Sequence, residues 1–239
     1  MSGLIYIQTD GKVLRKEAAI MKKIALVYTS ASDLLLKTMQ DAVRAQFDEE
    51  VEIREYLDPS VIDEAKQYGY VTEAGARKFV NMFEKASAEG ADIIVCSCSS
   101  MGDVGANAKA LYNMMGQKFM GVDEGMAAAA VQAGKVIGLI GTVNTTFAPS
   151  THTIERAAAA IGKDVHIIGK MVDVFNAGHD EYVSAMLAGC REIEDKIDCF
   201  VFAQASMYSY ADEFKAALKK PCFFSVDLGA AAIRKALEA

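Results

Sequence analysis

A cysteine at the end of an apolar run, Cys98, has the clearest potential for chemistry in this sequence. It follows the apolar run 93–95 and precedes Ser99, Ser100 and a helical pattern. Such a run is typical of a buried parallel strand, and the two serines suit the turn into a helix. In open α/β sheets ligands bind at this edge, where a helix N-terminus favours thiolate over thiol. We therefore predict that Cys98 is a catalytic acid or base; the alternative is a free cysteine that fills space at a strand end.

Hydroxyl side chains follow other expected strands as well. One group follows the strand expected at 23–29, and a second group follows the strand expected at 135–141. Such clusters are often helix N-caps, but at matching places they could also hold a substrate carboxylate together with backbone amides. The predicted substrate-binding residues are Ser30, Ser99, Ser100, Thr142, Thr145, Thr146, Ala205 and Ser206.

No motif for a metal or a cofactor accompanies these residues. Cys96 and Cys98 lack further ligands at a recognisable spacing, and Cys96 is expected in the core. The sequence has no glycine-rich loop for a dinucleotide or a phosphate. Asp123 and Glu124 follow a strand end, where they tune the charge of the site or form the solvated first turn of a helix. We expect an enzyme that needs no metal, nicotinamide or pyridoxal cofactor.

The composition indicates a globular protein with an acidic surface. The 239 residues carry a formal net charge of -7, which argues against nucleic acid or an anionic membrane as a partner. No segment has the length and apolarity of a signal peptide or a membrane span. The five cysteines are expected to be reduced thiols. These features predict a cytoplasmic protein.

The elements that must position these residues alternate along the chain. Strand patterns are separated by helical patterns throughout, which predicts an α/β protein with parallel sheets flanked by helices. The expected strands are 23–29, 51–57, the run before Cys98, 118–122, 135–141, 164–169, 199–203 and 222–226. Ahead of them, residues 4–14 alternate around Asp10-Gly11, which predicts an extra N-terminal β-hairpin within residues 1–20.

A weak internal repeat relates two parts of the chain. The segments 24–29, 92–101 and 119–125 match the segments 137–142, 198–207 and 223–229, in the same order. Cys98 falls on Gln204 in this comparison. We predict two pseudo-symmetric lobes, one of residues 1–123 with 225–239 and one of residues 124–224, with the active-site cleft between them. The alternative is that any two strand-helix units look alike.

Three segments resemble the aspartate/glutamate racemase superfamily, which includes the hydantoin racemases. They are Cys98-Ser99-Ser100, the block from Val122-Asp123-Glu124-Gly125 to Thr145-Thr146, and Phe202 to Met207. The resemblance covers nearly the whole chain after the expected hairpin. It implies a small carboxylate substrate held between two strand ends, no cofactor, and two cysteines that exchange the α-proton from opposite faces. This chain departs from that pattern at the second cysteine, where Gln204 stands.

The departure leaves the type of reaction open. Removing a proton next to a carboxylate needs a base on one face and donors for the enediolate oxygens. Cys98 can be that base, but racemisation also needs an acid on the other face, and Gln204 can only donate a hydrogen bond. Three hypotheses follow: racemase-like proton transfer at a small amino or hydroxy acid, a one-sided single-cysteine decarboxylase or isomerase, and a non-catalytic protein that binds small carboxylates. Alanine-rich and methionine-rich helix faces are compatible with a homodimer.

Overall fold

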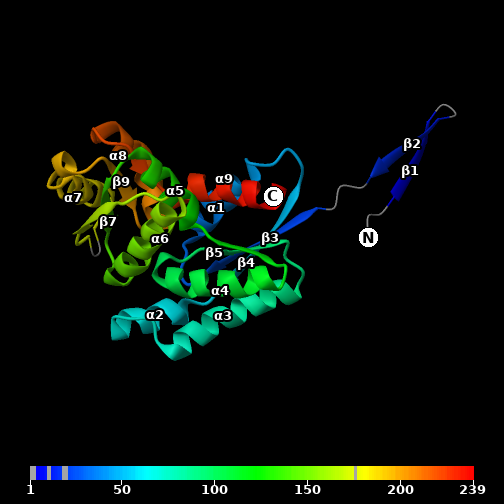
Figure 1. The fold of residues 1–239 in the computed structure, drawn as a ribbon, viewed down its shortest axis with the longest axis horizontal. Coiled ribbons are helices and arrows are strands. Elements are labelled where there is room, and N and C mark those ends of the chain that lie inside the picture. The colour runs from blue at the N-terminus through cyan, green and yellow to red at the C-terminus, as the bar shows by residue number, and fades with distance from the viewer. Residues whose placement is uncertain (1–3, 10–11, 18–20, 175–176) are drawn as a thin grey trace.

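The described part of the chain contains two parallel sheets and the helices around them (Figure 1). The computed structural model describes the backbone of residues 4–9, 12–17, 21–174 and 177–239, and the side chains of residues 21–174 and 177–239. Strands and helices alternate along the chain from residue 22 onward. This alternation confirms the α/β class and the parallel sheets flanked by helices.

The first sheet holds the strand that leads to Cys98. Its strands are β3 (Lys22–Tyr28), β4 (Val51–Leu57), β5 (Ile93–Cys96) and β6 (Lys118–Gly121), in the order β4-β3-β5-β6. The residues of β5 are all buried, as are the last five residues of β3. Helices cover both faces of the sheet, which is why its central strands are continuous apolar runs rather than alternating patterns.

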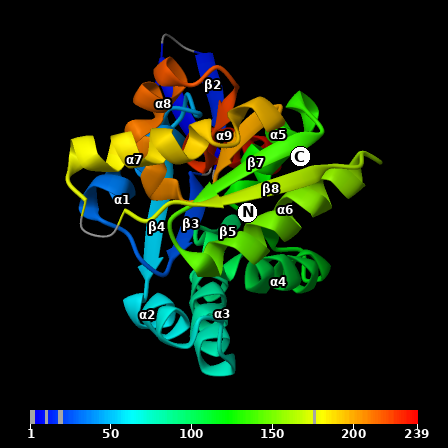
Figure 2. The same ribbon diagram turned by 90° about the vertical axis from the view of Figure 1, so that its left-hand side faces the viewer.

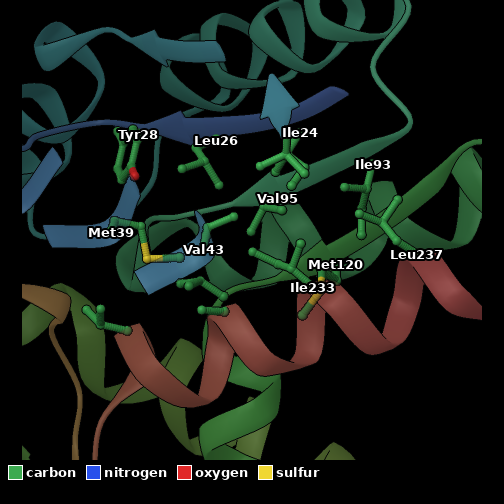
Figure 3. Close-up of a cluster of buried hydrophobic side chains, with 14 residues drawn as sticks. Ile24, Leu26, Tyr28, Met39, Val43, Ile93, Val95, Met120, Ile233 and Leu237 are labelled. Carbon is green, nitrogen blue, oxygen red and sulfur yellow. The ribbon is translucent and has the colours of Figure 1, made fainter. Parts of the chain in front are cut away.

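In the part of the chain that the structure describes, five helices surround the first sheet. They are α1 (Asp33–Arg44), α2 (Pro59–Tyr68), α3 (Glu73–Ala88), α4 (Gly102–Met114) and α9 (Ser225–Glu238). On one face α1 and α9 pack against the strands, and Figure 3 shows Ile233 of α9 beside Val95 and Met120 of the sheet. On the other face, α3 and α4 contribute Phe83 and Tyr112 to a second core cluster. The last helix of the chain therefore completes the core of the first sheet.

The second sheet repeats this arrangement. Its strands are β7 (Val136–Gly141), β8 (His166–Met171), β9 (Cys199–Phe202) and β10 (Cys222–Phe223), in the order β10-β9-β7-β8. Its helices are α5 (Asp123–Ala133), α6 (Phe147–Ala160), α7 (His179–Arg191) and α8 (Ala211–Ala217). Core clusters place α5 and α6 on one face and α7 and α8 on the other. Figure 2 shows β7 and β8 side by side with α6 next to them.

The register of the two sheets agrees with the sequence repeat. Ile24 of β3 is the partner of Ile93 of β5, and the matching residue Ile137 of β7 is the partner of Cys199 of β9. A matching aspartate also precedes β5 and β9. Asp92 accepts a hydrogen bond from the backbone of Lys23, and Asp198 accepts one from that of Lys135, both at 2.7 Å. The repeat therefore describes equivalent strand positions and not only a generic strand-helix pattern.

Some element boundaries differ from the sequence-based expectations. The strand expected at 222–226 ends at Phe223, because Ser225 already begins α9. The helical pattern of residues 179–196 is not one helix, since α7 ends at Arg191 and a short 3-10 segment, Glu194–Lys196, follows it. The first of these errors has a clear cause, since apolar residues at the start of a buried helix look like the continuation of a strand.

The expected N-terminal hairpin is only partly within the described residues. β1 (Leu4–Thr9) and β2 (Lys12–Glu17) pair antiparallel, with Thr9 opposite Lys12. The residues expected to form the turn, 10 and 11, lie outside the described residues. The hairpin as an added unit of the fold stays a prediction, and so does the division of the chain into two lobes at residues 123–124 and 224–225.

Two matched glycines allow α5 and α9 to cross closely. A Cβ atom on Gly125 would collide with the backbone oxygen of Leu228, and one on Gly229 would lie 2.7 Å from the backbone oxygen of Val122. Backbone atoms cannot move aside as a flexible side chain can. The repeat pairs Gly125 with Gly229, so the same close contact is made from both helices.

We expect Gly229→Ala to lower the free energy of unfolding by about 2 kcal/mol because the added methyl group forces the two helices apart. Helix propensity alone would make the alanine variant more stable by about 1 kcal/mol. A loss of stability would therefore arise from the close contact between α5 and α9. Urea denaturation gives the value. Gly178→Ala is the matched control, since no atom lies within 4 Å of a Cβ at that position; equal stability of the two variants would contradict the prediction.

Candidate active site

Residues that follow strands of both sheets line one pocket of about 270 Å³. The predicted site residues in its wall are Ser30, Cys98, Ser99, Ser100, Thr146, Gln204, Ala205 and Ser206. Thr142 and Thr145 are absent from this wall, but each makes a hydrogen bond to a residue in it. The volume lies just below the usual range for drug-sized ligands, so the pocket suits a small molecule.

The strand order explains why these residues meet. In the first sheet β3 lies between β4 and β5, so the chain leaves β3 and β5 toward helices on opposite faces. The diverging connections leave a crevice at the carboxyl ends of the two strands. The second sheet has the same arrangement, with β7 between β8 and β9. The pocket is therefore built from two such strand edges.

The thiol of Cys98 lies against a threonine from the neighbouring strand end. Its Sγ atom is 2.7 Å from Oγ1 of Thr29, which is buried. Burial raises the pKa of the half-buried Cys98 thiol above its usual 9.0, while the Thr29 hydroxyl and the Met101 backbone oppose that effect. At neutral pH the resting thiol is therefore protonated and can act as a proton donor.

The amide of Gln204 is held by Thr142. Its Oε1 atom accepts hydrogen bonds from the backbone N–H of Thr142, at 2.7 Å, and from its hydroxyl, at 3.1 Å. A backbone N–H can only donate, so this contact establishes which end of the amide is the oxygen. The amide nitrogen lies 2.9 Å from the same hydroxyl and carries a second hydrogen that can reach a ligand. Gln204 can bind, but it cannot carry a proton.

The two pairs occupy matching positions of the repeat. Thr29 matches Thr142, and Cys98 matches Gln204, so each sheet presents a threonine beside the residue that follows the neighbouring strand. Thr29 was not among the predicted site residues. Its match with the predicted residue Thr142 is the signal in the sequence that could have identified it.

Two of the predicted hydroxyls connect the two sheets. The Oγ atom of Ser100 lies 2.9 Å from Oγ1 of Thr145. Ser100 belongs to the 3-10 turn Ser99–Met101 after β5, and Thr145 belongs to the 3-10 turn Asn144–Thr146 after β7. Thr145 therefore acts on the pocket through Ser100 and does not line it.

The other hydroxyl groups either stabilise local structure or lie in the pocket wall. Thr146 donates to the backbone oxygen of Val143 at 2.7 Å, which stabilises the turn, but its side chain makes no cap hydrogen bond to α6, so it is not the capping side chain considered as an alternative. The N-cap of α1 is Ser32, whose side chain accepts from the backbone N–H of Leu35. Ser30 is not the cap, and it lies exposed on the pocket wall. Its hydroxyl is thus available for a ligand.

A lysine that the sequence did not single out is the one charged residue among the described residues that line the pocket. Lys66 is an exposed residue in the last turn of α2 and makes no ion pair within the described ranges. In the sequence it looks like an ordinary solvated helix residue. Only the placement of α2 beside the carboxyl end of β3 brings this cation to a site for an anion.

The burial of Asp123 corrects the interpretation of a solvated helix turn. Asp123 is 8% exposed, and its Oδ1 atom has no hydrogen-bond partner in the described part of the chain. Burial raises the pKa of this carboxyl to about 6, against the opposing effect of the Ser99 and Ser225 hydroxyls. Glu124, by contrast, forms an ion pair with Lys109 at 2.6 Å. Cys96 lies in the core as predicted.

The described ranges contain neither a metal-binding cluster nor a membrane-spanning helix. There, no group of three or more His, Cys, Asp and Glu side chains is arranged to hold a metal ion. None of the helices in those ranges has the length and apolar character that crossing a bilayer requires.

A family model described as Asp/Glu/Hydantoin racemase matches residues 24–236 of the chain. This match includes both sheets and every residue named above as a candidate for the site. Among curated proteins, no relative of the chain was found.

Several solved racemase structures share the fold. A glutamate racemase isoform from Bacillus anthracis superposes with a TM-score of 0.69 at 17% identity, over 91% of this chain and 82% of that one. Allantoin racemase from Klebsiella pneumoniae gives 0.64 at 17% identity, over 91% and 87% of the chains. Aspartate racemase from Picrophilus torridus gives 0.64 at 13% identity, over 91% and 94%. At these identities the likeness concerns the fold alone.

Proposed function

Because this chain belongs to the Asp/Glu/hydantoin racemase family, we propose that it is a cofactor-independent isomerase. It transfers a proton at the carbon next to the carboxylate of a small amino or hydroxy acid. The active site of this proposal lies between two lobes, residues 1–123 with 225–239 and residues 124–224. A homodimer is the assembly that we expect.

The observation that carries the proposal is the thiol of Cys98 in a pocket lined by hydroxyl groups. The pocket has room for a small carboxylic acid, and Ser30, Ser99 and Lys66 offer donors for its oxygens. In our proposal these donors hold the carboxylate and stabilise the enediolate that forms when the α-proton leaves. Cys98 exchanges that proton, with Thr29 at 2.7 Å as a donor to the thiolate.

The amide of Gln204 favours a second candidate within the same family. In this alternative Gln204 replaces the second catalytic cysteine, and its amide donates to a substrate oxygen. The protonated resting thiol then supplies a proton to a carbanion from one face only. A decarboxylase or a single-base isomerase would work in this way, and it would release carbon dioxide or form one product stereoisomer.

Deuterium exchange at the α-carbon tests the proposed function. The protein is incubated in deuterated water with a panel of amino, hydroxy and dicarboxylic acids, and incorporation is followed by NMR and mass spectrometry. Exchange with both enantiomers formed supports the racemase, whereas carbon dioxide release or one enantiomer supports the one-sided reaction. Binding without any turnover across the panel would reject both and leave a non-catalytic carboxylate-binding protein.

We expect Lys66→Gln to raise KM about fivefold and to leave kcat nearly unchanged, because an exposed ion pair with the substrate carboxylate contributes about 1 kcal/mol. Added salt should raise the KM of the unmodified protein in the same direction through screening. Lys37→Gln is the control, since Lys37 is exposed on α1 and pairs with Asp41 outside the pocket. Identical KM values for the Lys66→Gln variant and the unmodified protein would contradict the role of Lys66.

A further inference from the structure

A small cavity lies behind the thiol of Cys98. This rear cavity has a volume of about 20 Å³, and its wall includes Cys96, Cys98, Gly121 and Asp123. Cys98 also lines the substrate pocket, so its side chain separates the two spaces. A volume of this size holds one water molecule where polar groups surround it.

Asp123 supplies a polar group without a partner to this cavity. Its side chain is more than nine-tenths buried, and Oδ1 accepts no hydrogen bond from any described residue. A buried carboxyl oxygen without a partner is rare, because burial without a hydrogen bond is costly. A water molecule in the rear cavity can donate to this oxygen, and Cys98 lines the same cavity.

A larger cavity lies next to the rear cavity. Ala106, Glu124, Thr153 and Arg156 line both the rear cavity and a larger outer cavity of about 360 Å³ between α4, α5 and α6. The outer cavity extends to Ile161, which is 48% exposed. The shared wall places the outer cavity next to the rear cavity, and no described residue lines both the outer cavity and the substrate pocket.

We propose that Asp123 returns a proton to the Cys98 thiolate through one water molecule in the rear cavity. The inference rests on the second candidate of the proposed function, in which the protonated thiol gives its proton to a substrate carbanion. The water then donates a proton to the sulfur and takes one from the Asp123 carboxylic acid. The resulting carboxylate is protonated again from solvent through the outer cavity, so that the thiol is restored while substrate or product still closes the pocket.

The direction of this transfer agrees with the charges around the two groups. Burial makes the pKa of the Cys98 thiol higher than that of the Asp123 carboxyl, which is about 6, so the thiolate takes the proton. The ionisable groups that face Asp123 across the rear cavity are Cys96, Cys98, Glu124 and Arg156. From α9 only the hydroxyl of Ser225 acts on it. Above pH 6 Asp123 is mainly ionised between transfers and takes up a proton through the outer cavity before each one; while it is ionised, its negative charge also disfavours the thiolate.

Two variants test the charge of Asp123 and the water route independently of each other. In Asp123→Asn the side chain keeps its shape but loses the acidic proton and the charge. In Ala106→Val the added methyl groups reach into both cavities, while Asp123 and Cys98 are unchanged. Asp227→Asn is the control, because Asp227 matches the position of Asp123 in the repeat but its side chain is 40% exposed.

The first readout is alkylation of Cys98 by iodoacetamide between pH 6 and pH 10, followed by mass spectrometry of the peptide that contains it. We expect Asp123→Asn to be alkylated about threefold faster at pH 8, because the thiol loses a neighbouring negative charge. Ala106→Val and Asp227→Asn should follow the unmodified protein. A profile of Asp123→Asn that coincides with that of the unmodified protein would overturn the link between the two groups, whether or not a substrate has been found.

The second readout is turnover at neutral pH. We expect kcat to fall about tenfold in Asp123→Asn and in Ala106→Val, with KM within twofold of the unmodified protein. Imidazole, a small buffer whose acid form is populated near neutral pH, should restore part of the rate in Asp123→Asn, which a purely structural defect would not allow. If the unmodified protein turns over but Asp123→Asn keeps its full kcat, the relay is wrong and the proposed function stands. If the unmodified protein shows no turnover at all, the result contradicts both the relay and the proposed function.

Discussion

Replacing Cys98 by alanine is expected to lower the rate of α-proton exchange about 1,000-fold, because the variant has no acid or base at the reacting carbon. Among the described residues that line the pocket, none besides Cys98 carries a thiol, a carboxyl or an imidazole, and Lys66 is assigned to the substrate carboxylate. Thr29 and the surrounding serines carry hydroxyls with very high pKa values, and Gln204 has no proton to give. Cys98→Ser should be nearly as inactive, since its hydroxyl keeps the hydrogen bond to Thr29 but does not ionise in the accessible range.

The measurement is the deuterium exchange described above, at substrate concentrations above and below KM. Substrate binding should persist in Cys98→Ser, so that a loss in kcat appears without a large change in affinity. Cys222→Ser is the matched control, because Cys222 is also a half-buried free cysteine but lies in the strand β10 of the second sheet. Exchange in Cys98→Ala at more than about one tenth of the unmodified rate would remove Cys98 from the mechanism.

Replacing Asp123 by asparagine is expected to stabilise the protein above pH 6 by as much as about 3 kcal/mol. Burial raises the pKa of this carboxyl from 3.8 to about 6. A group whose pKa is raised on folding favours the folded state at low pH, and this contribution is lost as the pH rises through its folded value. The unmodified protein therefore loses stability between about pH 4 and pH 7, and the asparagine variant does not.

Urea denaturation at pH 4.5 and pH 8 measures this effect. The gain in unfolding free energy from Asp123→Asn should be small at pH 4.5 and largest at pH 8. The control Asp227→Asn should show no such gain, because Asp227 is partly exposed and accepts a hydrogen bond from the backbone N–H of Leu228. An asparagine variant that is less stable than the unmodified protein at pH 8 would show that the carboxylate has a favourable structural role.

Asp123→Asn is expected to increase the free energy of unfolding and to decrease kcat. Such opposite effects are typical of a functional group. A buried carboxyl with one unpartnered oxygen destabilises the fold, yet the same burial raises its pKa toward neutrality. Proteins retain such groups where activity requires them, so that removing one increases stability and decreases the rate. A variant that is more stable and slower would agree with both predictions at once.

The sequence by itself determined the architecture of this protein. Apolar runs that alternate with helical patterns predict parallel sheets covered by helices. The repeat agrees with the pairing of Ile24 with Ile93 in the first sheet and of Ile137 with Cys199 in the second. The repeat also placed Cys98 and Gln204 at equivalent strand ends. These features depend on local periodicity and on short-range order along the chain, which a sequence displays directly.

Only the tertiary structure decided which polar residues meet and how deeply they are buried. Thr29 and Cys98 are 69 positions apart, yet they come within 2.7 Å because β3 and β5 are neighbours in the sheet. Asp123 follows a strand just as a solvated residue would, and only the packing of the start of α5 against the turn after β5 and the start of α9 encloses it. Burial and the distance between remote segments set the pKa of a thiol or a carboxyl, and both arise from packing rather than from residue type.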